Sequence, residues 1–229
     1  MLFIENSYLK QFNGKIIEIS ENKIILNETI FYAKSGGQPG DIGTLNINGK
    51  KINIIDTIKD SKNNIIHISD SNIELKIGDE AKGEINWEMR YKHMRMHSAL
   101  HVLCSVIPYG VTGGQIGFDK SRLDFDLKDN QIDKDEIQEN INILMEKEHK
   151  IDYQWITLEE LDKQPELVRT MSVKPPRITG KIRLVKIGDI DLQPCGGTHV
   201  KNTHEIGRIA IQKIENKGKK NRRINIILN

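Results

Sequence analysis

Long apolar runs and a disulfide framework are both missing from this chain of 229 residues. No apolar run approaches the ~20 residues that a membrane-spanning helix needs. Residues 1–10 lack the basic start and the apolar stretch of a secretory signal. With two cysteines in all, each thiol is expected to be a buried side chain, a metal ligand or a nucleophile. These absences predict a cytoplasmic protein with an ordinary hydrophobic core.

A strong net charge is absent as well, because the formal net charge is only +2. This value does not by itself indicate nucleic-acid binding. The distribution is less even: residues 124–148 are rich in acids, and basic residues gather elsewhere. One basic stretch holds Lys174, Arg177, Lys181, Arg183 and Lys186, and the C-terminal end holds Lys213, Lys217, Lys219, Lys220, Arg222 and Arg223. Charge alone leaves open a solvated surface or a binding surface for a polyanion.

The first part of the chain, to about residue 86, has the pattern of an all-β domain. Short isoleucine-rich runs alternate with turn signals. The expected strands are residues 15–19, 23–26, 42–47, 51–58 and 65–68. Asn48-Gly49 is the strongest hairpin signal in the chain. Many short, evenly spaced strands predict a small β-barrel.

The spacing becomes helical after Trp87. Residues 88–107 carry an apolar stripe with helical periodicity, and Pro108 ends it. The stripe consists of Met96, Leu100, Leu103 and Ile107.

Helices and strands are mixed in the remainder of the chain. We expect a hairpin from residues 111–118 and 121–127, a helix over 133–150 capped by Asp133, and strands at 181–187, 206–214 and 224–228. This mixture predicts an α+β domain. The expected organisation is therefore a β-barrel domain at residues 1–87 and an α+β domain at residues 88–229.

Two short motifs carry the residue types of a metal site. His97 and His101 are four residues apart on the predicted helix, so both imidazoles lie on one face. Cys195 and His199 are also four apart, with two glycines between them that permit a tight turn. Either pair alone is a weak signal, and Cys195 could instead be a buried thiol beside a surface histidine. Together the four residues offer three imidazoles and one thiolate, all good ligands for Zn²⁺.

Other side chains compete for the same role. Cys104 shares the helix face of the two histidines, although a free cysteine is more typical of a core. His204 could replace His199. The other histidines, His67, His93 and His149, are expected to be ordinary surface or core residues. Four protein ligands are typical of a closed structural zinc site, whereas catalytic sites keep one position open, so the sequence leaves both kinds of site open.

The residues around these motifs resemble those of a known family. Residues 95–101 resemble the metal-binding helix of alanyl-tRNA synthetase editing domains, and residues 114–126 resemble the hairpin beside it. Residues 191–200 resemble the second metal motif of that domain, and residues 219–224 its terminal basic hairpin. Upstream, residues 31–41 resemble the glycine-rich motif of the N-terminal barrel. The motifs follow in the same order over essentially the whole chain.

This resemblance implies an N-terminal small β-barrel followed by an α+β editing domain like those of threonyl- and alanyl-tRNA synthetases. Because these motifs occupy essentially the whole chain, we expect no aminoacylation domain. We therefore expect a freestanding editing protein of the longer type, which carries the N-terminal barrel. The implied activity is deacylation in trans of mischarged tRNA(Ala), chiefly Ser-tRNA(Ala) and also Gly-tRNA(Ala), by zinc-dependent ester hydrolysis. Ala33-Lys34 departs from the family pattern of a proline and a small polar residue, so we base no prediction of the substrate range on this segment.

The expected enzyme must cleave a seryl ester and spare an alanyl one. A pocket with polar groups for the serine hydroxyl can do so, because alanine leaves those groups unpaired. Ser98 and Gln115 are the candidates, with Thr198 a weaker one. Ser98 could instead bond its own helix, and Gln115 could be an exposed hairpin residue. In the barrel, Gly36 and Gly37 either bring the backbone close to substrate or form a plain turn. The predicted substrate-binding residues are therefore Ser98, Gln115, Thr198, Gly36 and Gly37.

No carboxylate stands out as a general base, so the expected attacking group is a zinc-assisted water and no catalytic side chain is assigned.

Three alternative functions remain open. The chain could be a zinc hydrolase of small esters or amides, an RNA-binding protein with a structural zinc, or an editing enzyme for another mischarged tRNA.

Overall fold

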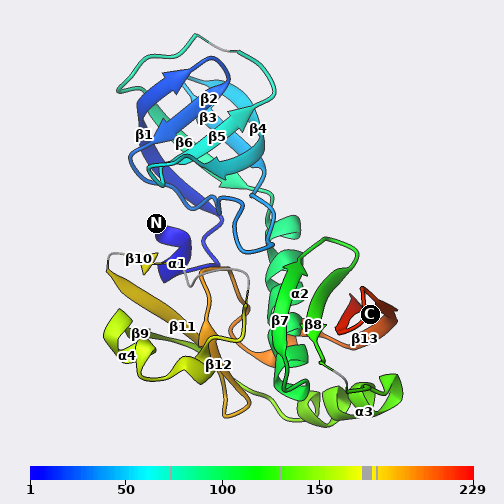
Figure 1. Ribbon diagram of the computed structural model, residues 1–229. Helices are drawn as coiled ribbons and strands as arrows, with labels where there is room; N and C mark the ends of the chain where they lie inside the picture. Colours follow the sequence, from blue (N-terminus) through cyan, green and yellow to red (C-terminus); the bar gives the residue numbers. More distant parts are fainter. Residues whose placement is uncertain (73, 129, 172–176, 179) are drawn as a thin grey trace. The chain divides into compact units, whose positions relative to one another are not determined.

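The computed structural model describes residues 1–72, 74–128, 130–171, 177–178 and 180–229 (Figure 1). Lys174 of the basic stretch lies outside the described residues. The chain divides into two compact units, an N-terminal unit of Met1–Lys92 and a C-terminal unit of His93–Asn229. None of the helices within the described ranges is both long and apolar enough to cross a bilayer.

The N-terminal unit is a closed barrel of antiparallel strands in the order β1-β2-β5-β4-β3-β6, coloured blue to cyan in Figure 1. A short helix, α1 (Leu2–Glu5), precedes it. The strands are β1 (Gln11–Ser20), β2 (Lys23–Leu26), β3 (Gly43–Ile47), β4 (Lys50–Lys59), β5 (Ile65–Ser69) and β6 (Glu80–Ile85). The predicted small barrel is confirmed.

Alternation of apolar and polar residues places one face of each strand inside the barrel. The core is built mainly from isoleucine, with leucine and phenylalanine. Asn48 and Gly49 join β3 to β4 with φ of 52° and 76°, which confirms the hairpin because a type I′ turn needs positive φ at both central residues.

Strand β6 was not predicted, and its inward residues explain why. They include Ala81 and Gly83, which give almost no hydrophobic signal. A Cβ atom on Gly83 would lie 2.0 Å from the ring of Phe12, so the neighbouring strand fills the space that a larger side chain would need.

The C-terminal unit combines two sheets with helices. Its elements are the larger part of α2 (Trp87–Val106), β7 (Gly110–Gln115), β8 (Ser121–Asp126), α3 (Lys134–Met145), β9 (Ile151–Ile156), α4 (Leu158–Asp162), β10 (Arg177–Ile178), β11 (Lys181–Ile187), β12 (Asp191–Pro194), β13 (Ile209–Asn216) and β14 (Asn221–Leu228). One sheet has the order β13-β14-β8-β7, and in the other β11 pairs with β9, β10 and β12. This mixed content confirms the α+β fold.

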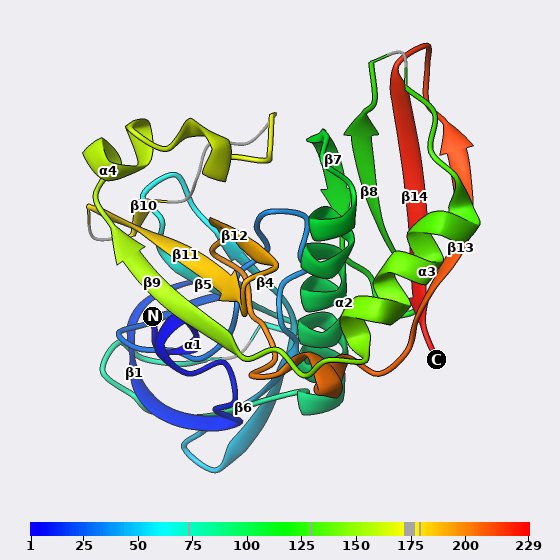
Figure 2. The same ribbon diagram turned by 90° about the horizontal axis from the view of Figure 1, so that it is seen from below.

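Helix α2 stands between these two sheets (Figure 2). Its predicted apolar stripe, from Met96 to Ile107, is buried throughout. Arg169 holds its C-terminal end, since Nη2 donates hydrogen bonds to the backbone carbonyls of Cys104, Ile107 and Tyr109. These bonds satisfy carbonyls that have no partner within the helix.

Three sequence predictions need correction. The second helix ends at Met145 rather than Lys150, although Asp133 does cap it by accepting hydrogen bonds from the amides of residues 135 and 136. The strand predicted over 206–214 begins at Ile209, because Thr203–Ile206 forms a 3₁₀ turn. The strands predicted at 181–187 and 206–214 leave out β12, whose Asp-Leu-Gln-Pro sequence has low strand propensity and becomes a strand by pairing with β11.

Candidate metal centre

Four side chains predicted from separate motifs lie together in the C-terminal unit. They are His97 and His101 of α2 and Cys195 and His199 of the loop after β12, and we call them the tetrad. Their ligand atoms all lie within 4.8 Å of one another. The Sγ atom of Cys195 is 3.4 Å from Nε2 of His97 and 3.3 Å from Nε2 of His199. All three histidines are buried, and the group could hold a metal ion.

A buried carboxylate supports one of these imidazoles. Nδ1 of His101 lies 2.8 Å from Oδ2 of Asp191. The side-chain amide of Gln193 donates to both oxygens of that carboxylate, at 3.1 and 2.9 Å. With Nδ1 engaged, Nε2 of His101 is the nitrogen left for a ligand. Sequence reasoning missed this role for Asp191.

A hydroxyl supports a second imidazole. Oγ of Ser98 is 3.1 Å from Nδ1 of His199 and accepts a hydrogen bond from the backbone amide of Val200 at 3.3 Å. Ser98 is fully buried. The structure therefore connects Ser98 to His199, an arrangement that neither the substrate-binding prediction nor the helix-carbonyl alternative anticipated.

The loop that carries Cys195 is held by a buried arginine. Arg183 of β11 donates from Nε to the carbonyl of Cys195 at 2.9 Å and from Nη2 to the carbonyl of Gly197. Its guanidinium also lies over the ring of Tyr153, 4.6 Å from the centroid. Arg183 is fully buried, so its assignment to a basic surface stretch is wrong. A single sequence cannot distinguish a buried arginine from an exposed one in a strand.

The electrostatics of the tetrad favour a thiolate. Burial raises the pKa of the Cys195 thiol, but the charges of His97 and His199 outweigh burial and bring that pKa well below its ordinary value. For His101, burial lowers the pKa, but the hydrogen bonds and charges of Asp191 and Cys195 together outweigh burial and raise it to about 10. A thiolate is the form of cysteine that binds metal.

The competing ligands lie outside the tetrad. Burial raises the pKa of the Cys104 thiol to about 12, as suits a core thiol. The side chain of His204 is 56% exposed and lies 3.8 Å from Glu148. In the barrel, His67 is buried and hydrogen-bonded to Thr29 at 2.8 Å.

Comparisons with known proteins identify the family. Residues 182–225 match the threonyl and alanyl tRNA synthetase second additional domain, and residues 3–89 match class II (A) tRNA synthetases. Over 234 residues the chain is 36% identical to the alanyl-tRNA editing protein AlaX-M of Methanosarcina barkeri, covering 97% of this chain and 96% of that protein. The chain belongs to the alanyl-tRNA editing protein family.

Other relatives extend this result. The AlaX-M protein of Saccharolobus solfataricus is 35% identical over 230 residues, with 97% of this chain and 96% of that protein covered. An alanine–tRNA ligase from Pyrococcus abyssi is 31% identical over 223 residues, which cover 93% of this chain but only 24% of the ligase. The similarity thus spans nearly the whole length of these editing proteins but only a part of the synthetase.

The other predicted site residues of this family member fall into different environments. Thr198 is fully buried, whereas Gln115 is exposed at the end of β7. Oε1 of Gln115 accepts a hydrogen bond from Nε of Arg122 at 3.3 Å. Arg122 and Arg223 both bind the carboxylate of Asp124, at 2.7 to 2.9 Å.

Gly36 and Gly37 occupy a tight turn. Their φ angles are 55° and 82°, a region that favours glycine. Ser35 and Gln38 exchange backbone hydrogen bonds across the turn, at 3.1 and 2.9 Å. A Cβ atom on Gly36 would meet no atom within 4 Å, so conformation rather than crowding requires glycine there.

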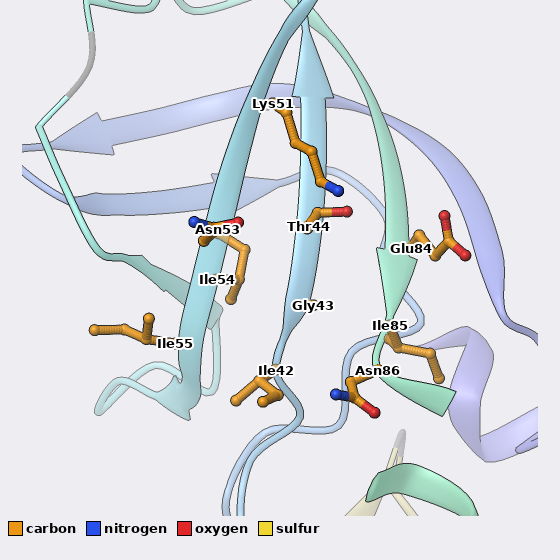
Figure 3. A pocket seen from close by; sticks show the side chains of 10 residues that line it. All are labelled: Ile42, Gly43, Thr44, Lys51, Asn53, Ile54, Ile55, Glu84, Ile85 and Asn86. Atoms are coloured by element: carbon orange, nitrogen blue, oxygen red, sulfur yellow. The ribbon is translucent and has the colours of Figure 1, made fainter. Parts of the chain in front are cut away.

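The barrel surface carries a separate groove of about 540 Å³ (Figure 3). Thr44, Lys51 and Asn53 line it together with Glu84 and apolar residues such as Ile42. No tetrad residue belongs to its lining. The groove is open, and its lining carries charges of both signs. This lining therefore indicates no particular class of ligand.

Proposed function

We propose that the chain removes wrong amino acids from tRNA(Ala) in trans, chiefly serine and also glycine, by zinc-dependent hydrolysis of the ester bond. The observation that carries the proposal is the convergence of the tetrad in a member of the alanyl-tRNA editing protein family. Members of this family are aminoacyl-tRNA deacylases, and the chain is an enzyme of that class. In this proposal residues 1–87 form the barrel domain and residues 88–229 the editing domain.

The donor set fits Zn²⁺, because three imidazole nitrogens and one thiolate are its preferred ligands. When bound, Zn²⁺ would polarise the ester carbonyl or lower the pKa of an attacking water. The chain itself supplies ligand orientation, through the contacts of Asp191 and Ser98. A site that depends on a free thiolate also suits the reducing cytoplasm, which is the location we propose.

Selectivity for serine requires polar groups that meet its hydroxyl. We keep Ser98, Gln115, Thr198, Gly36 and Gly37 as the proposed substrate-binding residues. Gln115 is the most accessible of the polar three, and its contact with Arg122 is long enough to be exchanged for a contact with substrate. Ser98 already has two partners, so we propose that it acts on substrate selection through the position of His199.

The hairpin formed by β13 and β14 is the proposed contact for the tRNA acceptor stem. Lys217, Lys219 and Lys220 lie at its turn and are exposed. If they bind phosphates, log K for tRNA will fall linearly with log salt concentration, and replacing all three by glutamine will reduce that slope. A slope unchanged in this triple variant would remove the hairpin from the interface.

The decisive experiment is deacylation of Ser-tRNA(Ala), Gly-tRNA(Ala) and Ala-tRNA(Ala) by wild type and by Cys195→Ala, with zinc content measured for each preparation. We expect wild type to release serine and spare alanine. Cys195→Ala should lose zinc and at least ~100-fold of its activity, since even residues that only support ligands cost 10–100-fold. Cys104→Ala is the matched control, because it removes the other thiol from a core position and should keep both zinc and activity.

One further function has a specific observation in its favour. Four protein ligands form a closed set that is typical of structural zinc, which suits an RNA-binding protein without catalysis. Zinc-loaded wild type that leaves every substrate intact but binds tRNA would establish this alternative. Hydrolysis of Ser-tRNA(Thr) in preference to Ser-tRNA(Ala) would instead reassign the enzyme to another mischarged tRNA.

A further inference from the structure

We propose that Asp191 is a positioning residue of the metal centre, whose carboxylate holds the imidazole of His101 with Nδ1 protonated and Nε2 directed to the metal. This inference rests on the proposed zinc site and deepens it. It assigns a role to a residue that contacts neither metal nor substrate in the proposal.

The geometry supports a specific contact between these two side chains. The side chains of Asp191 and His101 are 3% and 6% exposed, and Oδ2 lies 2.8 Å from Nδ1. Water is thus almost excluded from the contact, so the hydrogen bond is not weakened by competing solvent. A carboxylate in this position accepts a hydrogen bond from Nδ1–H and cannot donate one, which defines the tautomer of the imidazole.

Strand β12 explains how the carboxylate reaches this position. Asp191 and Gln193 are two residues apart and therefore lie on the same face of the strand. Gln193 donates to both carboxylate oxygens, which orients Asp191 toward α2. The same strand continues into the loop that presents Cys195. The pairing of β12 with β11 consequently places both a metal ligand and the support of another ligand.

The burial of this carboxylate is explained by function rather than by packing. Removing a carboxylate from water is strongly unfavourable unless it is paired and hydrogen-bonded. Here the offsetting partners are a metal-ligand imidazole and one amide, both polar. An apolar residue would fill the same space without that cost. A carboxylate behind a ligand histidine orients the ring and increases its basicity as a ligand, which explains its presence.

The test is zinc affinity of the full chain, measured by competition with a chromophoric chelator. We expect Asp191→Asn and Asp191→Ala to bind zinc about 10–100-fold more weakly than wild type. Asp189→Asn is the matched control, because it removes the same charge two residues away at a fully exposed position and should leave the affinity unchanged. Long-range ¹H–¹⁵N spectra of the histidine rings in the zinc-loaded chain add a readout of the tautomer that a purely structural role would not move.

Wild-type affinity together with an unchanged His101 ring signal in both Asp191 variants would overturn the inference. If these variants fail to fold, Gln193→Leu provides the test, because it keeps the carboxylate but removes its orienting amide. We expect a several-fold loss of affinity in Gln193→Leu, and no loss would overturn the inference. Failure of the wild type to bind zinc would instead refute the zinc in the proposed function, so the two failures are distinguishable.

Discussion

The interiors of the two units are stabilised in different ways. The barrel interior of the N-terminal unit consists almost wholly of isoleucine, leucine and phenylalanine. The centre of the C-terminal unit buries polar side chains around the tetrad, among them Ser98, Arg183, Asp191 and Gln193. Apolar burial is non-directional and tolerates small shifts, whereas a buried polar group is stable only with its partners in place. We infer that the C-terminal unit has less stabilisation from apolar burial at its centre, and that its buried polar contacts instead hold the tetrad in a fixed geometry.

Buried charged and titratable side chains in the N-terminal unit interrupt this contrast. Arg90 and Asp41 form a buried ion pair, and His67 is buried in the barrel.

Each unit contains one tryptophan, Trp87 in the N-terminal unit and Trp155 in the C-terminal unit, so the unfolding of each unit can be followed by its own fluorescence. Replacing Trp155 or Trp87 by phenylalanine isolates the reporter that remains.

The largest expected loss of stability follows from the removal of the Arg90 side chain. Its guanidinium donates to both oxygens of Asp41 and to the carbonyls of Ser7 and Ile30, at 2.9 and 2.6 Å for the carbonyls. Arg90→Met leaves a buried carboxylate without its counter-charge. We expect the free energy of unfolding of the N-terminal unit to fall by about 3–5 kcal/mol, as measured by urea denaturation with Trp87 fluorescence.

Lys15→Met supplies the control for this prediction. It removes a cation from an exposed pair with Glu80 at 3.5 Å, which contributes no more than about 1 kcal/mol. Equal, small effects of the two substitutions would show that the barrel tolerates an unpaired Asp41, and they would contradict the premise that a buried polar group is stable only with its partners in place.

The second prediction concerns acid and His67. Burial lowers the pKa of His67 to about 4, below the ordinary value of 6.5, so the folded barrel holds the neutral imidazole. Protonation therefore favours the unfolded chain as pH falls below about 6.5, and the loss levels off below about 4. We expect the N-terminal unit to lose about 3 kcal/mol from this residue between pH 7 and pH 4.

His67→Gln isolates that contribution, since glutamine keeps a polar side chain but does not titrate. The stability of this variant, followed through Trp87, should depend less on pH than that of the wild type over the same range. Parallel curves for the two proteins would mean that carboxylates, not His67, determine the acid sensitivity of the barrel.

The third and smallest stability effect is expected at Arg183. Arg183→Met leaves the carbonyls of Cys195 and Gly197 without this donor, which should cost the C-terminal unit about 2 kcal/mol. Because the loop carries a tetrad residue, zinc affinity should fall as well. Trp155 fluorescence and chelator competition measure the two effects.

Lys181→Met on the same strand is the matched control, because Lys181 is exposed and should change neither quantity by much. A loss of stability at Arg183 with unchanged zinc affinity would show that the loop keeps its geometry without the arginine. The C-terminal unit would then resemble the barrel more closely than the comparison suggests.

Much of the fold was predictable because its signals are local. The isoleucine alternation and Asn48-Gly49 predicted the barrel hairpin, and the stripe from Met96 to Ile107 predicted the central helix. Strands β6 and β12 were missed, because Gly83 in one and the Asp-Leu-Gln-Pro sequence of the other have little strand propensity. Their conformation comes from partners far away in sequence, which local patterns do not contain.

The sequence by itself determined which side chains can bind a metal, since the spacing of His97 and His101 and of Cys195 and His199 already puts each pair on one side of a helix or turn. Only the tertiary structure decided that the two pairs meet and that Asp191, Ser98 and Arg183 support them. The physical reason is distance along the chain. Ser98 and His199 are joined by a hydrogen bond between residues 101 positions apart, and such a contact follows from packing α2 against the β11–β12 sheet rather than from any local preference.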